Sequence, residues 1–381
     1  MAKYFFIAGE ASGDMHAAAL ISAIRRRDKK SVFVGFGGDK MQSAGCRLVC
    51  HYRDMAFMGV VDVVMHAPDV VRNLRLARRT MTTEKPDALV LVDYPSFNLK
   101  IAKFCRRRLP QTKIYYYISP KVWAWKTWRV HTIAKLTDKV LCIFPFESEF
   151  YARYGYKATY VGNPTANYVK AFMKNNSQVE RKSNVVALLP GSRKHEVQKC
   201  LPRMLAAASS FINVKVVIAK APSLPTELYE QIVEQTREKY KLGQLNIEFR
   251  EDTYHLLLEA ALAVVNSGTA TLETALLGCP QVAVYHVDCG HLLNLVRPLL
   301  FKLNYFTLPN IIAGKQVIRE LLAYEFTADA LKKEIEHLLL DDDYRRQMLY
   351  DYKLISDILG DLQAPETAAK LCCKSVKKHK T

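Results

Sequence analysis

One aspartate stands where acid–base chemistry is possible. Asp93 follows the apolar run 88–92 and precedes Tyr94 and Pro95. Because Pro95 forces a turn, the carboxylate of Asp93 is left at the carboxyl end of a predicted strand. A carboxylate in such a place can act as a general base. It can equally cap the helix expected to begin near Asn98, and the residues alone leave both interpretations open.

A glycine-containing turn follows the first apolar run of the chain. Gly9–Asp14 has two glycines, and Ser12 is predicted to cap the helix that follows. A backbone of this kind can approach a ligand at a helix N-terminus, with Glu10 and Ser12 as the candidate substrate contacts. The glycine spacing is GxxxG and not GxGxxG, so the turn does not predict a nicotinamide dinucleotide.

Two later turns indicate a nucleotide. Leu189–Arg193 ends in a guanidinium, which suits a pyrophosphate. The run 266–275 places small residues at a helix start, where free N–H groups and the helix dipole attract an anion. Its candidate anion contacts are Ser267, Gly268, Thr269 and Thr271. Glu273, about one turn into that helix, could accept both ribose hydroxyls, although a capped helix with a surface glutamate would have the same sequence.

All three tryptophans fall within six positions, at Trp123, Trp125 and Trp128. They follow the Tyr-rich apolar run 113–118, so they lie past a predicted strand, where open α/β sheets bind ligands. Aromatic faces beside Arg129 suit a sugar, a phosphate or an acyl chain. For any single tryptophan, a role in wedging a loop onto the domain is the simpler interpretation, but the cluster favours a substrate surface.

These turns need parallel strands to bring them together, and the sequence predicts two series of them. Apolar runs that read as strands alternate with helical patterns in both halves of the chain; they are 4–8, 32–35, 60–64, 88–92, 113–118, 140–144 and 159–162, then 185–189, 215–219, 246–249, 263–266 and 281–285. The polar stretch 175–184 between the two series is predicted to be a linker. The expected fold is therefore α/β, with two Rossmann-like domains facing a cleft and a helical C-terminal segment.

The domain boundaries follow from this pattern. Residues 1–174 are expected to form the first domain and residues 184–345 the second. Residues 346–381 are expected to form helices and a basic tail that can pack back on the first domain. The chain is long enough for two domains of ~150 residues, and 50% of its residues are hydrophobic.

The composition favours a cytoplasmic protein. No run approaches the ~18 apolar residues of a membrane helix, and the run 4–8 leads directly into a polar turn, unlike a signal peptide. The nine cysteines are scattered, contain no CxxC pair, and predict neither disulfides nor a zinc site.

The net charge of +18 favours a polyanionic partner, which could be nucleic acid, an anionic membrane or a phosphorylated substrate. Arg72, Arg75, Arg78 and Arg79 are spaced to share one helical face. The apolar run 58–65 precedes them. An apolar patch beside a basic stripe is typical of a protein on an anionic bilayer, although a core strand followed by a solvated helix fits as well. The candidate membrane contacts are Val60, Val63, Val64, Arg72, Leu74 and Arg75.

Eight ordered motifs carry a resemblance to a known family. They are AGEASGD (8–14), FVGFGGDKMQSAG (33–45), MGVVDVV (58–64), SPKVWAW (119–125) with Arg129, PFE (145–147), LPGSR (189–193), SGTATLE (267–273), and LPNIIAG with RELL (308–322). In this order they resemble the lipid-A-disaccharide synthases, GT-B glycosyltransferases of Gram-negative outer-membrane lipid A synthesis.

The resemblance implies a reaction and roles for the site residues. It implies inverting transfer from UDP-2,3-diacylglucosamine to 2,3-diacylglucosamine 1-phosphate with release of UDP, without a metal or other cofactor. Asp93 would be the general base on the acceptor's 6-hydroxyl, and Arg193 with the 267–271 loop would hold the UDP pyrophosphate. Glu273 would bind ribose, and Asn310 would help to shape the uridine pocket. The enzyme would lie on the inner face of the cytoplasmic membrane, and a homodimer is left open.

Three positions depart from the family pattern. Ser96 stands where a second aspartate is common, Asn163 replaces a usual histidine, and His286 stands where a basic residue is common. Two other functions also remain to be distinguished. A UDP-N-acetylglucosamine 2-epimerase would share the fold and the nucleotide loop but would not need the tryptophan cluster. A nucleic-acid-binding protein would explain the charge, but no recognisable nucleic-acid-binding module is present, so no nucleic-acid partner is expected.

Overall fold

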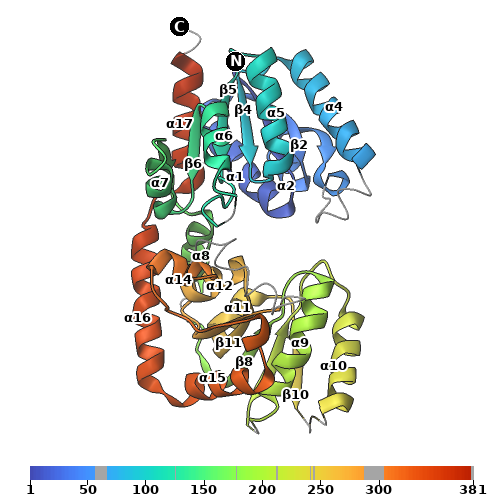
Figure 1. The fold of residues 1–381 in the computed structure, drawn as a ribbon, viewed down its shortest axis with the longest axis vertical. Coiled ribbons are helices and arrows are strands. Elements are labelled where there is room, and N and C mark those ends of the chain that lie inside the picture. The colour runs from blue at the N-terminus through green and yellow to red at the C-terminus, as the bar shows by residue number, and fades with distance from the viewer. Residues whose placement is uncertain are drawn as a thin grey trace. The chain divides into compact units, whose positions relative to one another are not determined.

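The structure of the chain is a computed structural model that describes residues 1–55, 67–124, 126–176, 178–211, 213–240, 242, 245–286 and 304–378. It divides into two units, Met1–Asn167 with Asp361–Thr381, and Tyr168–Gly360 (Figure 1). No helix within these described ranges is long and apolar enough to cross a membrane.

The first unit is built on a parallel sheet of seven strands in the order β3-β2-β1-β4-β5-β6-β7. The strands are β1 (Lys3–Ala8), β2 (Val32–Gly37), β3 (Arg47–His51), β4 (Ala88–Val92), β5 (Lys113–Tyr117), β6 (Lys139–Cys142) and β7 (Ala158–Tyr160). The helices are α1 (Ala11–Arg27), α2 (Asp39–Ser43), α4 (Ala67–Glu84), α5 (Pro95–Arg108), α6 (Arg129–Leu136), α7 (Pro145–Ala152) and α17 (Ala364–Lys378), with a 3₁₀ turn η1 at Tyr52–Asp54; α8 (Pro164–Asn175) continues into the second unit.

The second unit is built on a parallel sheet of six strands in the order β10-β9-β8-β11-β12-β13. The strands are β8 (Lys182–Leu189), β9 (Lys215–Ala219), β10 (Asn246–Arg250), β11 (Ala260–Asn266), β12 (Gln281–Tyr285) and β13 (Glu320–Leu322). The helices are α9 (Lys194–Ala208), α10 (Thr226–Tyr240), α11 (Thr253–Glu259), α12 (Thr269–Leu276), α14 (Leu308–Ala313), α15 (Ala328–Leu340) and α16 (Asp342–Leu359), with a 3₁₀ turn η2 at Ala323–Glu325.

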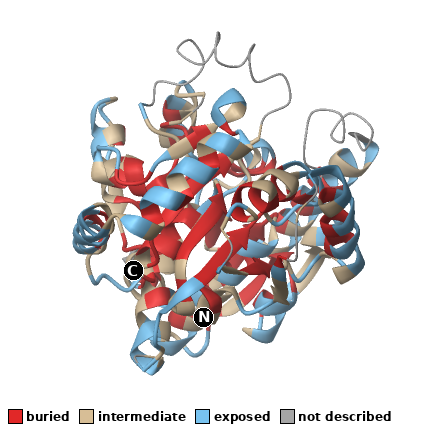
Figure 2. Ribbon diagram, turned by 90° about the horizontal axis from the view of Figure 1, so that it is seen from below, coloured by how far each residue is buried: buried red, intermediate tan, exposed pale blue. Residues whose placement is uncertain are grey.

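The two core clusters of the first unit lie on opposite faces of its sheet, because side chains alternate between the faces along each strand. In β5, Tyr115 and Tyr117 face a cluster that includes residues of α1 and α17, whereas Tyr116 faces the opposite cluster, with residues of α4, α5 and α6. All three tyrosine side chains are fully buried, because helices cover both faces of this sheet. Figure 2 shows the same pattern, with buried residues concentrated along the strands and exposed residues on the outer sides of the helices.

The strand order places four of the predicted turns at special points. Each sheet reverses its winding beside its first strand, since β1 lies between β2 and β4, and β8 lies between β9 and β11. Open parallel sheets bind ligands at such reversal points, beyond the carboxyl ends of the strands. The turn 9–14 and Asp93 follow β1 and β4, while 190–193 and Ser267 follow β8 and β11. Each unit therefore has its candidate residues at its own reversal point.

The predicted α/β fold is confirmed, but some predicted boundaries are wrong. The units divide at Asn167 and again at Gly360, not at 174–184 and 345. The predicted linker 175–184 is partly regular, because β8 begins at Lys182 and pairs it with Ala260. The first three residues of β8 are exposed and therefore lack the apolar pattern of a buried strand. The short strands β3 and β13 were not predicted, and the predicted strand 60–64 lies outside the described residues.

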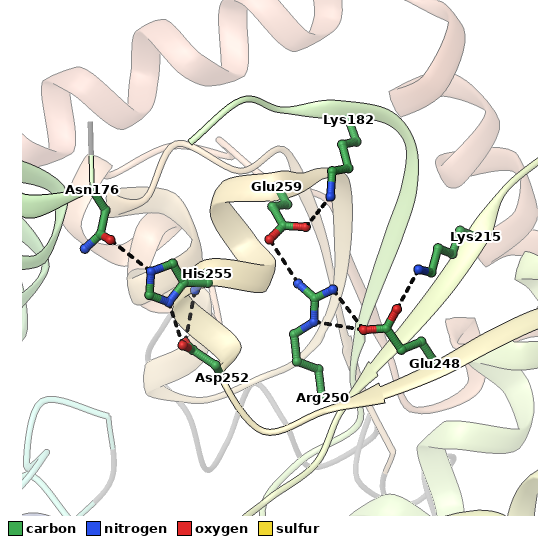
Figure 3. Close-up of polar contacts among 8 residues, drawn as sticks. All are labelled: Asn176, Lys182, Lys215, Glu248, Arg250, Asp252, His255 and Glu259. Carbon is green, nitrogen blue, oxygen red and sulfur yellow. Dashed lines mark hydrogen bonds and ion pairs between the residues drawn. The ribbon is translucent and has the colours of Figure 1, made fainter. Parts of the chain in front are cut away.

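Ion pairs hold the start of β8 in place (Figure 3). Glu259 bridges Lys182, at 2.8 Å, and Arg250, at 3.1 Å. Glu248 likewise lies between Arg250 and Lys215. These cations lower the pKa of both glutamates, with Lys182 the largest influence on Glu259 and Lys215 the largest on Glu248. The segment that looked like a free linker is therefore tied to β10 and α11.

The last helix belongs to the first unit. In α17, the side chains that face the sheet are buried against α1 and β5, and they are Ala368, Ala369, Cys372 and Val376. The hydroxyl of Tyr115 donates to the carbonyl oxygen of Cys372 at 3.4 Å. Residues 346–360, in contrast, belong to the second unit through α16.

Candidate functional site

The turn after β1 is organised by a residue that the sequence did not single out. Asp14 is buried, and its carboxylate accepts hydrogen bonds from the backbone N–H groups of Gly38 at 2.7 Å, Met41 at 3.0 Å and Lys40 at 3.1 Å. Asp14 thus joins the start of α1 to the start of α2. Asp14 is the last residue of the GEASGD motif (residues 9–14), but its hydrogen-bond partners come from the turn after β2, which is distant in the sequence.

The predicted cap of α1 is wrong. The N-cap residue is Glu10, which makes no side-chain capping bond, and Ser12 lies exposed in the first turn of the helix. The helix starts earlier than expected because Ala11 already has helical geometry. Ser12 therefore remains accessible to a ligand, and Glu10 stands at the N-terminus of α1, half-buried.

Asp93 sits on a sharp turn between β4 and α5, which we call the Asp93 elbow (residues 93–94). Asp93 and Tyr94 have φ values of 43° and 47°, in the left-handed region. The helix begins at Pro95 with Tyr94 as its N-cap, so the alternative role of Asp93 as a helix cap is wrong. Asp93 instead keeps solvent-accessible surface beyond the end of the sheet, although surrounding protein atoms crowd its carboxylate.

The surroundings of Asp93 make its carboxylate more basic than usual. Desolvation raises the pKa of Asp93 to about 6, and the nearby carboxylate of Glu10 adds to the rise, whereas Lys121 opposes it. A carboxyl group with a pKa in this range is ionised at neutral pH and still binds a proton readily, as a general base must. Asp93, Glu10 and Lys121 come from the ends of β4, β1 and β5.

Close packing at Gly9 explains how Glu10 and Asp93 come together. A Cβ atom on Gly9 would lie 2.4 Å from the Cγ atom of Tyr94, so the aromatic ring rests directly on the glycine backbone. Glu10 follows Gly9 and Asp93 precedes Tyr94 in the chain. The contact between Gly9 and Tyr94 therefore brings their neighbouring carboxylates to one place, and only glycine leaves room for it.

The tryptophan cluster does not form one aromatic surface. Trp123 is buried, only 5% exposed, and its indole N–H donates to Glu147 at 3.1 Å while its ring packs against Phe146. Trp128 is 61% exposed, and the guanidinium of Arg129 lies 5.6 Å from its ring centroid. Trp125 lies outside the described residues. The prediction of substrate contact is therefore wrong for the Trp123 side chain, which anchors its loop, while Arg129 remains near the surface.

In the second unit, the turn after β8 is built around Glu196. Its carboxylate accepts hydrogen bonds from the backbone N–H groups of Ser192 and Arg193, at 3.1 and 3.3 Å, and pairs with the Arg193 guanidinium at 3.1 Å. Gly191 has φ +119°, and a Cβ there would lie 2.5 Å from Glu196. The Arg193 side chain is nevertheless 63% exposed at the end of β8, so it can reach a pyrophosphate.

The turn after β11 leads into α12 through Gly268, the N-cap residue. Gly268 and Thr269 are exposed and Ser267 is half-buried, which leaves these three accessible to an anion at the helix N-terminus. Thr271 is different. Its side chain is fully buried, and its hydroxyl donates to the carbonyl oxygen of Gly268 at 2.8 Å, so the predicted substrate contact through Thr271 is wrong.

Two other predicted donor contacts are engaged within the second unit. Glu273 is half-buried and accepts a hydrogen bond from the Tyr254 hydroxyl at 2.9 Å; burial raises the pKa of Glu273. Asn310 is fully buried, and its amide bonds to Val317, Ile318 and Glu320. All of the amide's hydrogen-bonding groups are used within the fold, so Asn310 can act on a uridine pocket only by fixing the segment 317–320, and its part in shaping that pocket stays a prediction.

The structure describes the surroundings of all three residues that depart from the family pattern. Ser96 is exposed in the first turn of α5. Asn163 is buried, donating to Ile143 and accepting from the backbone of Ala166, so its amide caps α8. The Nδ1 atom of His286 lies 3.2 Å from the guanidinium of Arg203.

The predicted apolar and basic patch is only partly described. Val60, Val63 and Val64 lie outside the described residues. Leu74 is 7% exposed and belongs to the core cluster beneath α4, so the prediction that it contacts a membrane is wrong. Arg72 and Arg75 are exposed on the outer side of α4, and Arg72 pairs with Asp69 at 3.1 Å.

The sequence of the chain is similar to those of known proteins. A family model described as lipid-A-disaccharide synthetase matches residues 4–369. A lipid-A-disaccharide synthase of Syntrophus aciditrophicus (strain SB) is 35% identical over 383 residues, covering 98% of this chain and 97% of that protein. One of Nitrosococcus oceani is 35% identical over 370 residues, covering 96% and 94%.

Solved structures share the fold at low identity. A UDP-GlcNAc 2-epimerase from Neisseria meningitidis, bound to UDP-GlcNAc, has a TM-score of 0.63 at 10% identity and covers 99% of this chain and 100% of its own. A calicheamicin glycosyltransferase has a TM-score of 0.58 at 15% identity, with 100% and 98% covered. These likenesses show the GT-B type of fold and do not separate epimerase from transferase. The sequence comparisons do, and the chain belongs to the lipid-A-disaccharide synthetase family, the glycosyltransferases of lipid A biosynthesis.

Proposed function

We propose that the chain transfers 2,3-diacylglucosamine from UDP-2,3-diacylglucosamine to 2,3-diacylglucosamine 1-phosphate, with Asp93 as the general base. The observation that carries the proposal is the carboxylate of Asp93 at the reversal point of the first sheet, with its pKa raised to about 6. Asp93 would take the proton from the acceptor's 6-hydroxyl as that oxygen attacks the anomeric carbon and the bond to UDP breaks, inverting the configuration.

The second unit would bind the donor. Arg193 and the exposed N-terminus of α12, formed by Ser267, Gly268 and Thr269, offer positive charge and N–H groups to a pyrophosphate. These groups would stabilise the negative charge that develops on the departing UDP, which is where preorganised charge is most effective. Glu273 would accept the ribose hydroxyls while Tyr254 orients its carboxylate. Neighbours of this fold that are described as bound to UDP or UDP-GlcNAc support a UDP-sugar donor.

The first unit would also dock on an anionic membrane surface, which would bring it to its acylated substrates. Exposed arginines run along α4, and the basic residues of α5 continue the positive surface. A shallow pocket of about 450 Å³ between the two helices is lined by Arg78, Lys100, Lys103, Phe104, Arg107 and Arg108. Five of these six residues are cations, which suits phosphate headgroups. This interpretation relies on the arginines and no longer on Leu74.

The reaction is tested by measuring UDP release from UDP-2,3-diacylglucosamine with and without the acylated acceptor. A transferase releases UDP in an acceptor-dependent manner and forms a disaccharide 1-phosphate. An epimerase would isomerise the sugar nucleotide without an acceptor. Acceptor-independent isomerisation, or failure to form the disaccharide with both substrates present in detergent, would overturn the proposed reaction.

A further inference from the structure

The Asp93 elbow has an unusual backbone. Two consecutive residues, Asp93 and Tyr94, are in the left-handed region although neither is glycine. Side chains other than glycine rarely adopt this conformation, and two in a row are rarer still. Such a backbone persists only where its surroundings hold it, and it is often found at functional sites. The contacts that hold the elbow therefore determine where the Asp93 carboxylate points.

Two buried side chains hold the elbow through one atom, the carbonyl oxygen of Asp93. The hydroxyl of Tyr116, from β5, donates to it at 2.7 Å. The side-chain amide of Asn98, from the first turns of α5, donates to it at 2.6 Å and to the carbonyl oxygen of Val92 at 3.2 Å. Tyr116 and Asn98 are both fully buried, so water does not replace either donor easily.

The chemistry of Asn98 shows that this contact is specific. Its amide nitrogen faces two carbonyl oxygens, which accept hydrogen bonds but cannot donate them. Its Oδ1 atom is buried and has no hydrogen-bond partner in the described part of the chain. The side chain thus leaves one polar atom unsatisfied while it holds the end of β4. The amide therefore donates to the elbow at the cost of one unsatisfied oxygen, and an apolar side chain would leave both carbonyl groups without this donor.

The other half of the elbow is held from outside. The hydroxyl of Tyr94 donates to the carbonyl oxygen of Met55 at 2.7 Å, and its ring rests on Gly9. Tyr94 therefore cannot swing away without losing both contacts. Tyr116 and Asn98 hold the carbonyl group of Asp93, so both residues of the elbow are fixed by contacts outside it.

We propose that Tyr116 and Asn98 are positioning residues that orient Asp93 for proton transfer. The inference rests on the proposed role of Asp93 as the general base. Neither side chain is accessible to a substrate, so neither would contribute to substrate affinity. Without either donor, the elbow would relax toward ordinary backbone geometry and move the Asp93 carboxylate. A misplacement of about 1 Å costs on the order of 100-fold in rate.

The chain offers a matched control beside Tyr116. Tyr117 lies in the same strand, is also fully buried, and faces the opposite side of the sheet. Its hydroxyl has no hydrogen-bond partner within the described residues. Tyr116→Phe and Tyr117→Phe therefore remove the same atom from the same strand, and only Tyr116→Phe removes a contact to Asp93.

The experiment compares Tyr116→Phe, Asn98→Asp, Tyr117→Phe and Asp93→Asn in the full chain, with kcat, KM for both substrates and UDP affinity by calorimetry. We expect Tyr116→Phe and Asn98→Asp to lower kcat by about 10- to 100-fold, with KM and UDP affinity unchanged and Tyr117→Phe fully active. Asn98→Asp is isosteric but replaces the donor by an acceptor; should it fail to fold, Tyr116→Phe decides alone.

Different failures have different meanings. If Asp93→Asn is inactive but Tyr116→Phe turns over normally, the positioning proposal is wrong and the assignment of the base stands. If Tyr117→Phe loses as much kcat as Tyr116→Phe, the effect comes from general loosening of the core, and the proposal is also wrong. If Asp93→Asn keeps full turnover, the base has been misassigned and the proposal for Tyr116 and Asn98 falls with it.

Discussion

The indole of Trp123 donates its hydrogen to the carboxylate of Glu147 at 3.1 Å, inside the first unit. The same carboxylate accepts the backbone N–H groups of Ile143 and Phe144, at 3.1 and 3.0 Å, at the start of α7. Burial raises the pKa of Glu147 to about 7, while these hydrogen bonds oppose the rise. One side chain thus joins the loop after β5 to the helix after β6.

Glu147→Ala should destabilise the first unit by about 2–4 kcal/mol, because it leaves several buried N–H groups without an acceptor. Urea denaturation followed by tryptophan fluorescence measures the loss. Glu149→Ala, on the same helix and without any of these three bonds, is the control. Equal midpoints for both variants would show that the Glu147 carboxylate does not hold the loop.

Gly9→Ala should disturb the site more than its single methyl group suggests. The new Cβ would lie 2.4 Å from the Tyr94 ring, so the ring or the turn must shift. We expect kcat to fall by on the order of 10-fold or more, with UDP binding by the second unit retained. Gly155→Ala serves as a control for steric effects, since nothing lies within 4 Å of its Cβ position, although its positive φ adds some strain. Full activity of Gly9→Ala would contradict the contact.

Asp93→Asn should abolish most turnover and yet stabilise the protein. The folded-state pKa of about 6 is above the ordinary 3.8, so the folded state binds the proton more tightly. Stability from this group is therefore fully present at low pH and declines as the pH rises through about 6. We expect kcat to fall by about 10²–10⁴ and the Tm of the variant to exceed that of the parent at about pH 8, with little difference at about pH 4. A Tm difference that grows toward acid pH would contradict the sign.

The proposed role of Asp93 also predicts the acid limb of the parent enzyme's pH profile. If Asp93 must be ionised, kcat should rise with an apparent pKa near 6. Glu10→Gln removes a negative charge that favours protonation, so it should move this limb to lower pH, whereas Lys121→Met should move it to higher pH. Unchanged limbs in both variants would separate Asp93 from the rate profile.

Arg193→Ala should weaken UDP binding by about 1.5–3 kcal/mol, the scale of a hydrogen bond to a charged group. The loss should stay near the lower end, because Arg193 also pairs with Glu196 and is well exposed. Isothermal calorimetry measures it, with Arg237→Ala on α10 as a control of equal charge. Unchanged UDP affinity would place the pyrophosphate elsewhere.

Charge reversal on α4 should release the protein from anionic vesicles. Each arginine near such a surface contributes about 1 kcal/mol, so Arg75→Glu with Arg79→Glu should lower binding to vesicles that contain phosphatidylglycerol. Lys332→Glu with Lys333→Glu on α15 changes the charge equally in the other unit. Sedimentation of both variants, and of the parent in high salt, distinguishes a local surface from net charge. Equal release by the two double variants would leave α4 without a special role.

The sequence predicted the strands and turns that carry the site better than it predicted the contacts of individual side chains. Buried parallel strands are continuous apolar runs, so β1, β4, β8 and β11 and the turns that follow them were visible. The ends of short exposed strands were not, because β3 and the start of β8 lack that signal.

The roles of individual polar residues depended on partners that are distant in the chain. Thr271 and Asn310 have side chains suited to binding a ligand, but the fold uses their hydrogen bonds internally. The sequence predicted that Trp123 contacts a substrate, but its indole is buried and donates to Glu147. The importance of Asp14, in contrast, could not be predicted, because the N–H groups that it binds belong to the start of α2. The residue types of Asp93 and Tyr94 did not predict that both have positive φ values, since neither residue is glycine.

The packing of α17 has a consequence for how the chain is made. Its buried residues close the first unit against Tyr4, whose hydroxyl lies 3.8 Å from the Cys373 sulfur, and against β5. While the ribosome is still translating the second unit, α1 can already pack on this face of the sheet, but the part of it that α17 covers stays exposed. The first unit can therefore be completed only after the whole of the second unit has been synthesised, because α17 follows the second unit in the chain.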